Sequence, residues 1–174
     1  LLGSRGLGDV YKRQEKNSGA ETWAGVTIGS GAGFLNDIPI TNTDTKIFVH
    51  VYVSGTTQTG IPIKLKIENS QDPTQSVETD TYTTVAGEWE TMEFDFSNES
   101  EGTAALNTDF VFDMASIFFN FGSSGNQNIV YYFDNVSFGS PLNADDNFFN
   151  TYNIYPNPFI DVINLFGIEG DETI

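Results

Sequence analysis

Aromatic and charged side chains alternate along two stretches, 46–54 and 61–68, that both have the pattern of β-strands. If the two strands pair, one face of the sheet presents five side chains together: His50, Tyr52, Lys64, Lys66 and Glu68. An aromatic ring can stack on the apolar face of a pyranose, while charged groups hydrogen-bond its hydroxyls. The spacing therefore predicts a sugar-binding face built from these two strands.

The distribution of basic residues agrees with this hypothesis. The chain has seven basic and 24 acidic residues, which gives a formal net charge of -17. Outside the first 14 residues there are four basic residues, and three of them, Lys46, Lys64 and Lys66, lie in these two stretches. The alternative is a solvated sheet face on which Lys and Glu form cross-strand pairs, each contributing about a few tenths of a kcal/mol. The sequence leaves both interpretations open.

Other aromatic residues could contribute to a ligand site or to the core. Trp23 is a further candidate for stacking on a sugar ring. Trp89 opens a strand directly after a glycine turn, and we expect it to pack over the edge of the core. In the last two strands most aromatics should be buried, with Phe118 and Tyr131 the most probable to face outwards.

The acidic residues near position 95 do not form a convincing catalytic motif. Glu93, Asp95 and Glu99 resemble the E-x-D-x-x-E strand of β-glucanases, but the last carboxylate lies one residue too far along. A glycosidase also needs two carboxylates about 5–10 Å apart in a long cleft. The single histidine, His50, lies in mid-strand without a serine nucleophile motif nearby. We therefore expect this chain not to be an enzyme.

Composition excludes several further functions. The absence of cysteine rules out a disulfide framework, a thiolate zinc site and a thiol nucleophile. A pI near 4.1 disfavours nucleic acid and anionic membrane surfaces as partners. No apolar run approaches the ~18 residues of a membrane span, so membrane insertion is not expected. Neutral ligands and divalent cations are better candidates.

Period-two alternation recurs through the centre of the chain, and no window has helical periodicity. Strands are predicted at 23–28, 46–54, 61–68, 77–84, 89–96, 115–121 and 129–138. The segments between them are rich in Gly, Ser, Asn, Asp and Pro, which form turns. Because each strand has one apolar face, two antiparallel sheets must pack against each other. The sequence predicts one all-β jelly-roll β-sandwich over residues 15–139, with a short C-terminal β tail.

The beginning of the chain differs in character from this central part. Residues 4–14 (SRGLGDVYKRQ) resemble the translation of a sequencing adapter. Such a segment is excluded from fold reasoning, so residues 1–14 are expected to be an artefact outside the fold. The chain is then expected to be an assembled fragment of a longer protein.

The end of the chain resembles a secretion signal. Residues 140–151 form a polar linker, and Tyr155 to Phe159 (YPNPF) then place two prolines around a turn before an alternating stretch. The tail 152–174 resembles the start of the C-terminal sorting domain used by type IX secretion in Bacteroidetes. The resemblance implies a secreted or cell-surface protein with the type IX secretion machinery as a partner. The alternative is an extra edge hairpin of the same sandwich.

The central part has a family resemblance of its own. Its runs VHVYVSG, GIPIKLKIEN, GEWETMEFDFS, SIFFNFG and YYFDNVSFG are similar to carbohydrate-binding jelly-roll modules of secreted polysaccharide-degrading enzymes from marine bacteria. The resemblance implies a non-catalytic polysaccharide-binding module attached to a glycoside hydrolase or polysaccharide lyase. It also implies a structural calcium ion, with Asp134, beside Asn135, as its expected ligand. The competing interpretation is a structural or adhesive surface module without a glycan site.

Overall fold

The computed structural model describes residues 11–29, 31–125 and 129–139, and in this part of the chain it contains strands and no helix. Accordingly, none of these residues belongs to a helix that could cross a membrane. Eight strands are present: β1 (Lys12–Glu15), β2 (Val26–Ile28), β3 (Lys46–Ser54), β4 (Pro62–Glu68), β5 (Ser76–Tyr82), β6 (Trp89–Asp95), β7 (Met114–Phe119) and β8 (Val130–Phe138).

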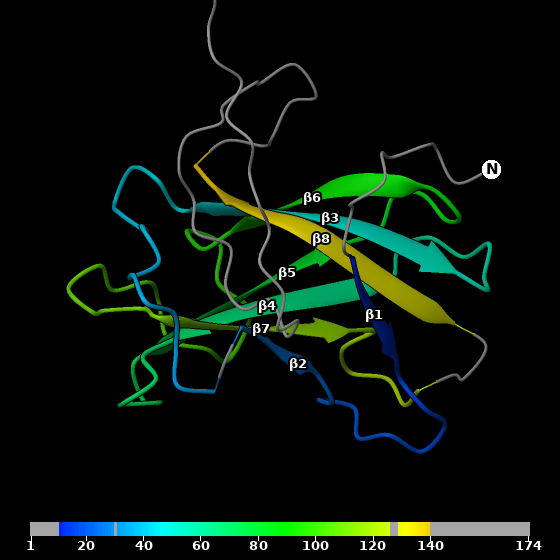
Figure 1. Cartoon of the computed structure of the whole chain (residues 1–174), viewed down its shortest axis with the longest axis horizontal. Coiled ribbons are helices and arrows are strands. Elements are labelled where there is room, and N and C mark those ends of the chain that lie inside the picture. The colour runs from blue at the N-terminus through cyan, green and yellow to red at the C-terminus, as the bar shows by residue number, and fades with distance from the viewer. Residues whose placement is uncertain (1–10, 30, 126–128, 140–174) are drawn as a thin grey trace, which may run out of the picture.

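The strands form two four-stranded antiparallel sheets packed face to face (Figure 1). One sheet has the order β1-β8-β3-β6 and the other has the order β2-β7-β4-β5. Consecutive strands therefore cross between the sheets several times, as they do in a jelly roll. The predicted all-β jelly-roll sandwich is confirmed, while its predicted C-terminal β tail lies outside the described residues.

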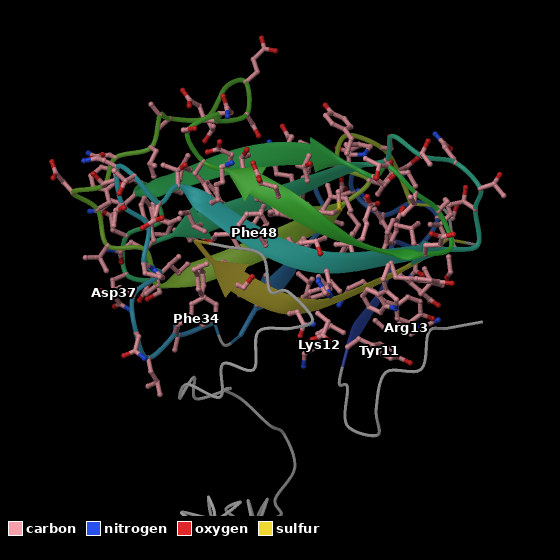
Figure 2. The ribbon with its side chains drawn as sticks, turned by 90° about the horizontal axis from the view of Figure 1, so that it is seen from above. Tyr11, Lys12, Arg13, Phe34, Asp37 and Phe48 are labelled. Carbon is pink, nitrogen blue, oxygen red and sulfur yellow. The ribbon has the colours of Figure 1, made fainter. Side chains whose placement is uncertain are left out.

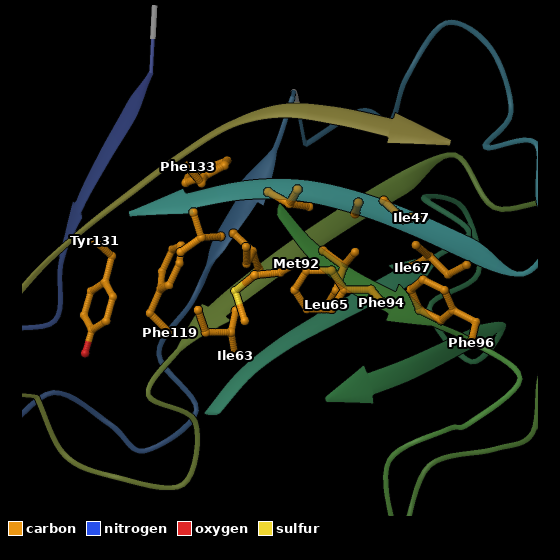
Figure 3. Packing of buried hydrophobic residues seen from close by; sticks show 14 of the residues in the cluster. Ile47, Ile63, Leu65, Ile67, Met92, Phe94, Phe96, Phe119, Tyr131 and Phe133 are labelled. Carbon is orange, nitrogen blue, oxygen red and sulfur yellow. The ribbon is translucent and has the colours of Figure 1, made fainter. Parts of the chain in front are cut away.

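The core lies between the sheets and is built from the apolar alternate positions of the strands (Figure 3). In β3 and β4 these positions are filled by β-branched residues and leucine, which suit the pleated backbone. The fully buried side chains include Ile47, Leu65 and Phe94, each no more than 1% exposed. Burial of these aliphatic and aromatic groups is the main source of stability, at about 25 cal/mol per Å² of apolar surface.

One strand lies where the sequence predicts none. β1 pairs with β8 in antiparallel register, from Lys12 opposite Phe133 to Glu15 opposite Val130. Three of its four residues belong to the segment that resembles an adapter, so residues 12–14 lie in a sheet and not outside the fold as predicted. A sheet edge offers unpaired N–H and C=O groups to any nearby extended segment, which explains why β1 pairs despite its polar sequence.

A β-bulge interrupts β8 next to the centre of its sheet. The register with β3 shifts between Phe48 and His50, whose partners on β8 are Ser137 and Asp134. Two residues of β8, Asn135 and Val136, lie between these partners where β3 has one, and Asn135 has a φ of 48°, in the left-handed region. Bulges of this kind redirect side chains and are frequent near functional sites.

Asp113 joins three loops at one end of the sandwich. Its carboxylate accepts hydrogen bonds from Ser70 N at 2.6 Å and from Ser70 Oγ at 2.7 Å. Its main-chain carbonyl accepts a hydrogen bond from Phe34 N. Gly33 has a φ of 87°, and a Cβ atom there would lie 2.7 Å from Asp113 Oδ2. Glycine is therefore required at this position both for its conformation and for space.

Candidate functional site

The structure does not bring the five predicted ligand-binding residues together. His50 and Tyr52 lie on β3, which pairs with β6 and β8, whereas Lys64, Lys66 and Glu68 lie on β4, which pairs with β5 and β7. Because β3 and β4 belong to opposite sheets, their outward faces point in opposite directions. The prediction that the two strands pair is wrong. The chain connects them across the sandwich, as jelly-roll topology requires.

The lysines of β4 form ion pairs on their own sheet face. Lys64 Nζ lies 3.0 Å from Glu78 Oε2 and 3.5 Å from Asp80 Oδ1, and its side chain is only 6% exposed. It also lies 4.4 Å from the centroid of the Phe121 ring. Lys66 Nζ pairs with Glu68 Oε2 at 2.5 Å. These contacts agree with the alternative of a polar sheet face with Lys–Glu pairs.

A cluster of aromatic rings lies on the outward side of the β1-β8-β3-β6 sheet. Tyr52 faces Trp89 on β6 and Tyr132 on β8 in the cross-strand register. The Tyr52 ring centroid lies 5.6 Å from that of Trp89 and 5.8 Å from that of Tyr132. All three side chains are intermediate in burial. We call this surface, defined by Tyr52, Trp89 and Tyr132, the aromatic face.

Trp89 and Tyr131 therefore differ from their predicted positions. Trp89 does not pack over the core edge. The side chains of β6 that point into the core are Met92 and Phe94, and residue 89 is an odd number of positions from Met92, so its side chain points to the other face of the sheet. Tyr131 does not face outwards: it is 2% exposed and stacks on Phe119 with ring centroids 4.8 Å apart. Burial raises the pKa of Tyr131 to about 12. The outward tyrosine of β8 is the next residue, Tyr132.

Polar side chains lie next to the aromatic face on the same sheet. His50 lies opposite Asp134 on β8 and opposite Thr91 on β6. The Nδ2 atom of Asn135 lies 3.3 Å from His50 Nδ1, within hydrogen-bond distance. The bulge in β8 thus brings an amide group to the side of a histidine. The aromatic face is thus bordered by side-chain donors and acceptors on the same sheet.

Trp23 and Phe118 lie elsewhere. Trp23 is in the segment between β1 and β2 and is 63% exposed. No ring contact with the aromatic face is found for it among the described residues. Phe118 does face outwards, as predicted, but on the β2-β7-β4-β5 sheet opposite Lys64. Trp23 remains a separate candidate for stacking.

The carboxylates considered for catalysis are held by neighbouring groups. Glu93 Oε1 lies 2.6 Å from Lys46 Nζ on the adjacent strand. Burial raises the pKa of Asp95, but hydrogen bonds from Ser97 and Thr45 outweigh it, so that the pKa lies below its ordinary value of 3.8. A general acid for glycoside hydrolysis needs the opposite, a raised pKa.

Lys16 is a buried cation that sequence analysis did not single out. It is 5% exposed, and burial lowers the pKa of its ammonium group. Its Nζ donates hydrogen bonds to the carbonyl oxygens of Thr22 at 2.8 Å, Asn120 at 3.1 Å and Phe119 at 3.4 Å. Lysine is rarely buried, and the sequence contains no signal that distinguishes this lysine from the exposed ones.

A small pocket of about 140 Å³ lies beside Lys16, between the end of β1, the start of β2, the end of β7 and the start of β8. Small residues such as Ala20, Ala24 and Gly25 form part of its wall. Its volume is well below the about 300–1,000 Å³ of typical ligand pockets. For a polysaccharide, an open sheet face is the better candidate.

The expected calcium ligand lies next to the aromatic face. Asp134 is on β8 opposite His50. Among the described residues, no three histidine or acidic side chains lie close enough together to hold a metal ion by themselves. Calcium takes six to eight oxygen ligands, including main-chain carbonyls, amides and water. A calcium ion at Asp134 would therefore need oxygen atoms of these kinds in addition to the carboxylate.

Comparisons with known proteins found no matching family model, no matching curated protein and no matching solved structure. The fold and the candidate site are consequently defined by this chain's own residues: a β-sandwich with jelly-roll strand order and a half-buried aromatic cluster on the outward side of one sheet.

Proposed function

We propose that this sandwich is a non-catalytic polysaccharide-binding module of a larger secreted glycan-degrading enzyme. The observation that carries the proposal is the aromatic face, on which Tyr52, Trp89 and Tyr132 lie within ring-contact distance on three adjacent strands. The three rings are half-buried on the outward side of the sheet, and the faces of aromatic rings suit the C–H surface of a sugar ring.

The polar surroundings of the aromatic face agree with a carbohydrate ligand. His50, Asn135 and Thr91 supply side-chain donors or acceptors beside the rings. The strong negative charge of the chain favours a neutral polysaccharide, such as a β-glucan, over one with a charged group on every sugar, such as alginate or a highly sulfated glycan. The face is flat and strand-built, which fits a chain of sugars better than a single small molecule.

We expect the Trp89→Ala variant to bind polysaccharide at least fivefold more weakly than the parent, because the largest aromatic ring of the cluster is removed. Affinity gel electrophoresis on β-glucan and alginate gels measures the change. Trp23→Ala is the matched control, since Trp23 is exposed but lies outside the cluster. A loss of retardation in the control alone would place binding at the loop of Trp23 and contradict the aromatic face.

Absence of binding would favour the competing function. If the parent protein were not retarded on a broad panel of polysaccharide gels, the glycan-binding proposal would fail. A structural or adhesive sandwich would then be the better description, with the aromatic face as a contact surface for another protein.

We also propose that Asp134 is a ligand of a structural calcium ion. An ion that binds only the folded state raises the melting temperature by mass action. Calcium should raise the melting temperature of the parent, excess chelator should lower it, and the Asp134→Asn variant should respond to neither. Differential scanning calorimetry checks this, and an identical calcium response in parent and variant would contradict Asp134 as a ligand.

The secretion part of the proposal depends on the tail. The YPNPF turn and the stretch after it lie outside the described residues, so the proposal is supported by the resemblance to type IX sorting domains. Fusion of residues 140–174 to a reporter and assay of its export by a type IX-competent host would test it. Retention of the reporter inside the cells would count against an exported protein.

A further inference from the structure

Tyr11 lies directly before β1 and is the outermost ring over the aromatic face. Its ring centroid is 5.3 Å from that of Tyr132 in an edge-to-face arrangement and 6.2 Å from that of Trp89. Tyr11 is 48% exposed, whereas the three rings of the aromatic face are less exposed. Tyr11, Lys12 and Arg13 lie close together at this side of the molecule (Figure 2).

The contact between Tyr11 and Trp89 spans the width of the sheet. β1 and β6 are the two edge strands of the sheet, with β8 and β3 between them. Three strand spacings separate them, about 14 Å between backbones. The centroid distance of 6.2 Å therefore requires the two side chains to lean towards each other over the middle of the sheet. The middle is where Tyr132 and Tyr52 lie.

The segment that carries Tyr11 is also attached to the face by its neighbour. Arg13 lies opposite Tyr132 in the register of β1 and β8. Its pKa is raised by hydrogen bonds to Glu15 and Tyr132, and it forms an ion pair with Glu15. β1 as a whole pairs with β8. These contacts hold Tyr11 near the rings even though it precedes the strand.

We infer that Tyr11 is an intramolecular competitor that covers the aromatic face and weakens its binding of a polysaccharide. The inference rests on the proposed function and concerns how accessible that same site is in a chain that carries residue 11. A sugar ring that stacks on Trp89 or Tyr132 must first displace the Tyr11 ring. The apparent affinity is lowered by the fraction of molecules in which the face is covered.

The size of the effect follows from the two ring contacts. Aromatic pairs contribute modestly beyond the area they bury, and two such contacts favour the covered state by about three- to tenfold. Loss of the Tyr11 ring should therefore raise the affinity for polysaccharide by about three- to tenfold. If residues 4–14 derive from an adapter, a chain without them would present an uncovered face.

The test compares the parent with the Tyr11→Ser variant, which keeps the residues of β1. Lys12→Ser is the matched control, because residue 12 is in β1 but has no ring. A second variant lacks residues 1–11 and leaves β1 intact, which separates loss of the ring from loss of the strand. All proteins carry Trp23→Phe, so that fluorescence reports Trp89 alone. Two readouts are measured: acrylamide quenching of Trp89 and retardation on β-glucan and alginate gels.

We expect Tyr11→Ser and the truncated variant to show stronger quenching of Trp89 and greater retardation, with Lys12→Ser like the parent. Unchanged quenching would overturn the inference, since Tyr11 would not cover Trp89. Stronger quenching with equal retardation of parent and variant would overturn the competition alone. If no protein is retarded on any gel, the proposed function fails, and the competition fails with it.

Discussion

The Lys16→Met variant is expected to lose about 2–4 kcal/mol of unfolding free energy. Methionine is similar in length and fills the same space without the charge. It leaves three carbonyl oxygens, of Thr22, Phe119 and Asn120, without the donor that they share in the parent. The carbonyl oxygens of Thr22 and Asn120 keep the main-chain hydrogen bonds from Gly122 N and Ser123 N, so the loss comes from the hydrogen bonds to the charged donor, which contribute about 1.5–3 kcal/mol each and less where water can reach them. Urea unfolding followed by tryptophan fluorescence measures the difference.

The location of Lys16 explains why the loss should be large. Its ammonium group joins the segment before β2, through Thr22, to the end of β7, through Phe119 and Asn120. Among the residues that the structure describes, no carboxylate forms an ion pair with it. The carbonyl oxygens are therefore the main compensation for burying this charge. Without the ammonium, the segment that carries Trp23 keeps the hydrogen bond from Gly122 N to Thr22 O but loses its charged donor near the end of β7.

The matched control is Lys46→Met. Lys46 pairs with Glu93, but the two side chains are 41% and 47% exposed, and exposed ion pairs contribute about 0–1 kcal/mol. The same chemical change should therefore cost about 1 kcal/mol or less at position 46. Equal losses at positions 16 and 46 would contradict a special role for the buried ammonium.

The pH dependence of stability provides a second measurement for Lys16. Burial lowers its pKa below the ordinary value of 10.5, so the folded state binds fewer protons than the unfolded state between the two pKa values. Stability rises with pH wherever the unfolded state binds more protons. The difference in unfolding free energy between parent and Lys16→Met should thus change in favour of the parent as the pH approaches 10.5. A difference that stays constant across this range would contradict the lowered pKa.

Most strands could be predicted from the sequence because apolar and polar residues alternate within each strand, whichever strands it pairs with. The alternation at 46–54 and 61–68 marks strands regardless of what they pair with, and β3 and β4 lie there. β1 could not be found in the same way, because Lys12–Glu15 has no apolar alternation. It is a strand because β8 offers a free edge, which is a property of the folded sheet and not of the segment.

The site could be predicted only in part because alternation does not say which strands pair. His50 and Tyr52 were assigned to the outward side of their strand, and both lie there. Their neighbours Trp89 and Tyr132 come from strands distant in sequence, and only the strand order brings them together. The prediction that Lys64 and Lys66 join the same site depends on pairing of the strands at 46–54 and 61–68, which are successive in sequence. In a jelly roll, successive strands cross to the opposite sheet, so nearness in sequence is misleading.

Lys64 provides the second large expected effect, on the sheet opposite the aromatic face. We expect Lys64→Met to lower the unfolding free energy by about 2–3 kcal/mol, because it breaks a largely buried ion pair and leaves its partners unpaired. Glu78 and Asp80 lie on the same face of β5, and without the ammonium between them their like charges repel. Their side chains are 29% and 31% exposed, so solvent screens part of the repulsion and the expected loss is below that of a fully buried pair.

The triple variant Lys64→Met, Glu78→Gln, Asp80→Asn removes the ion pair without leaving Glu78 and Asp80 charged. It therefore distinguishes the cost of losing the ion pair from the cost of the carboxylates that remain unpaired in Lys64→Met. Replacing a buried ion pair together with its partners is often neutral, whereas removing one partner is costly. The triple variant should therefore regain most of the stability that Lys64→Met loses. If it is as unstable as the single variant, the contact of the Lys64 ammonium with the Phe121 ring, and not compensation of the charges of Glu78 and Asp80, is the main contribution of Lys64.

The same variants separate the two sheet faces as ligand sites. Lys64 lies on β4, in the sheet that does not contain Tyr52, Trp89 or Tyr132, so its replacement changes no contact of the aromatic face. The triple variant, folded and measured well below its melting temperature, should be retarded on polysaccharide gels as strongly as the parent. Loss of retardation in this variant, with binding retained by Trp89→Ala, would move the ligand site to the β2-β7-β4-β5 sheet. The ion pairs of Lys64 and Lys66 would then be the sugar contacts, and the aromatic face a surface with another partner.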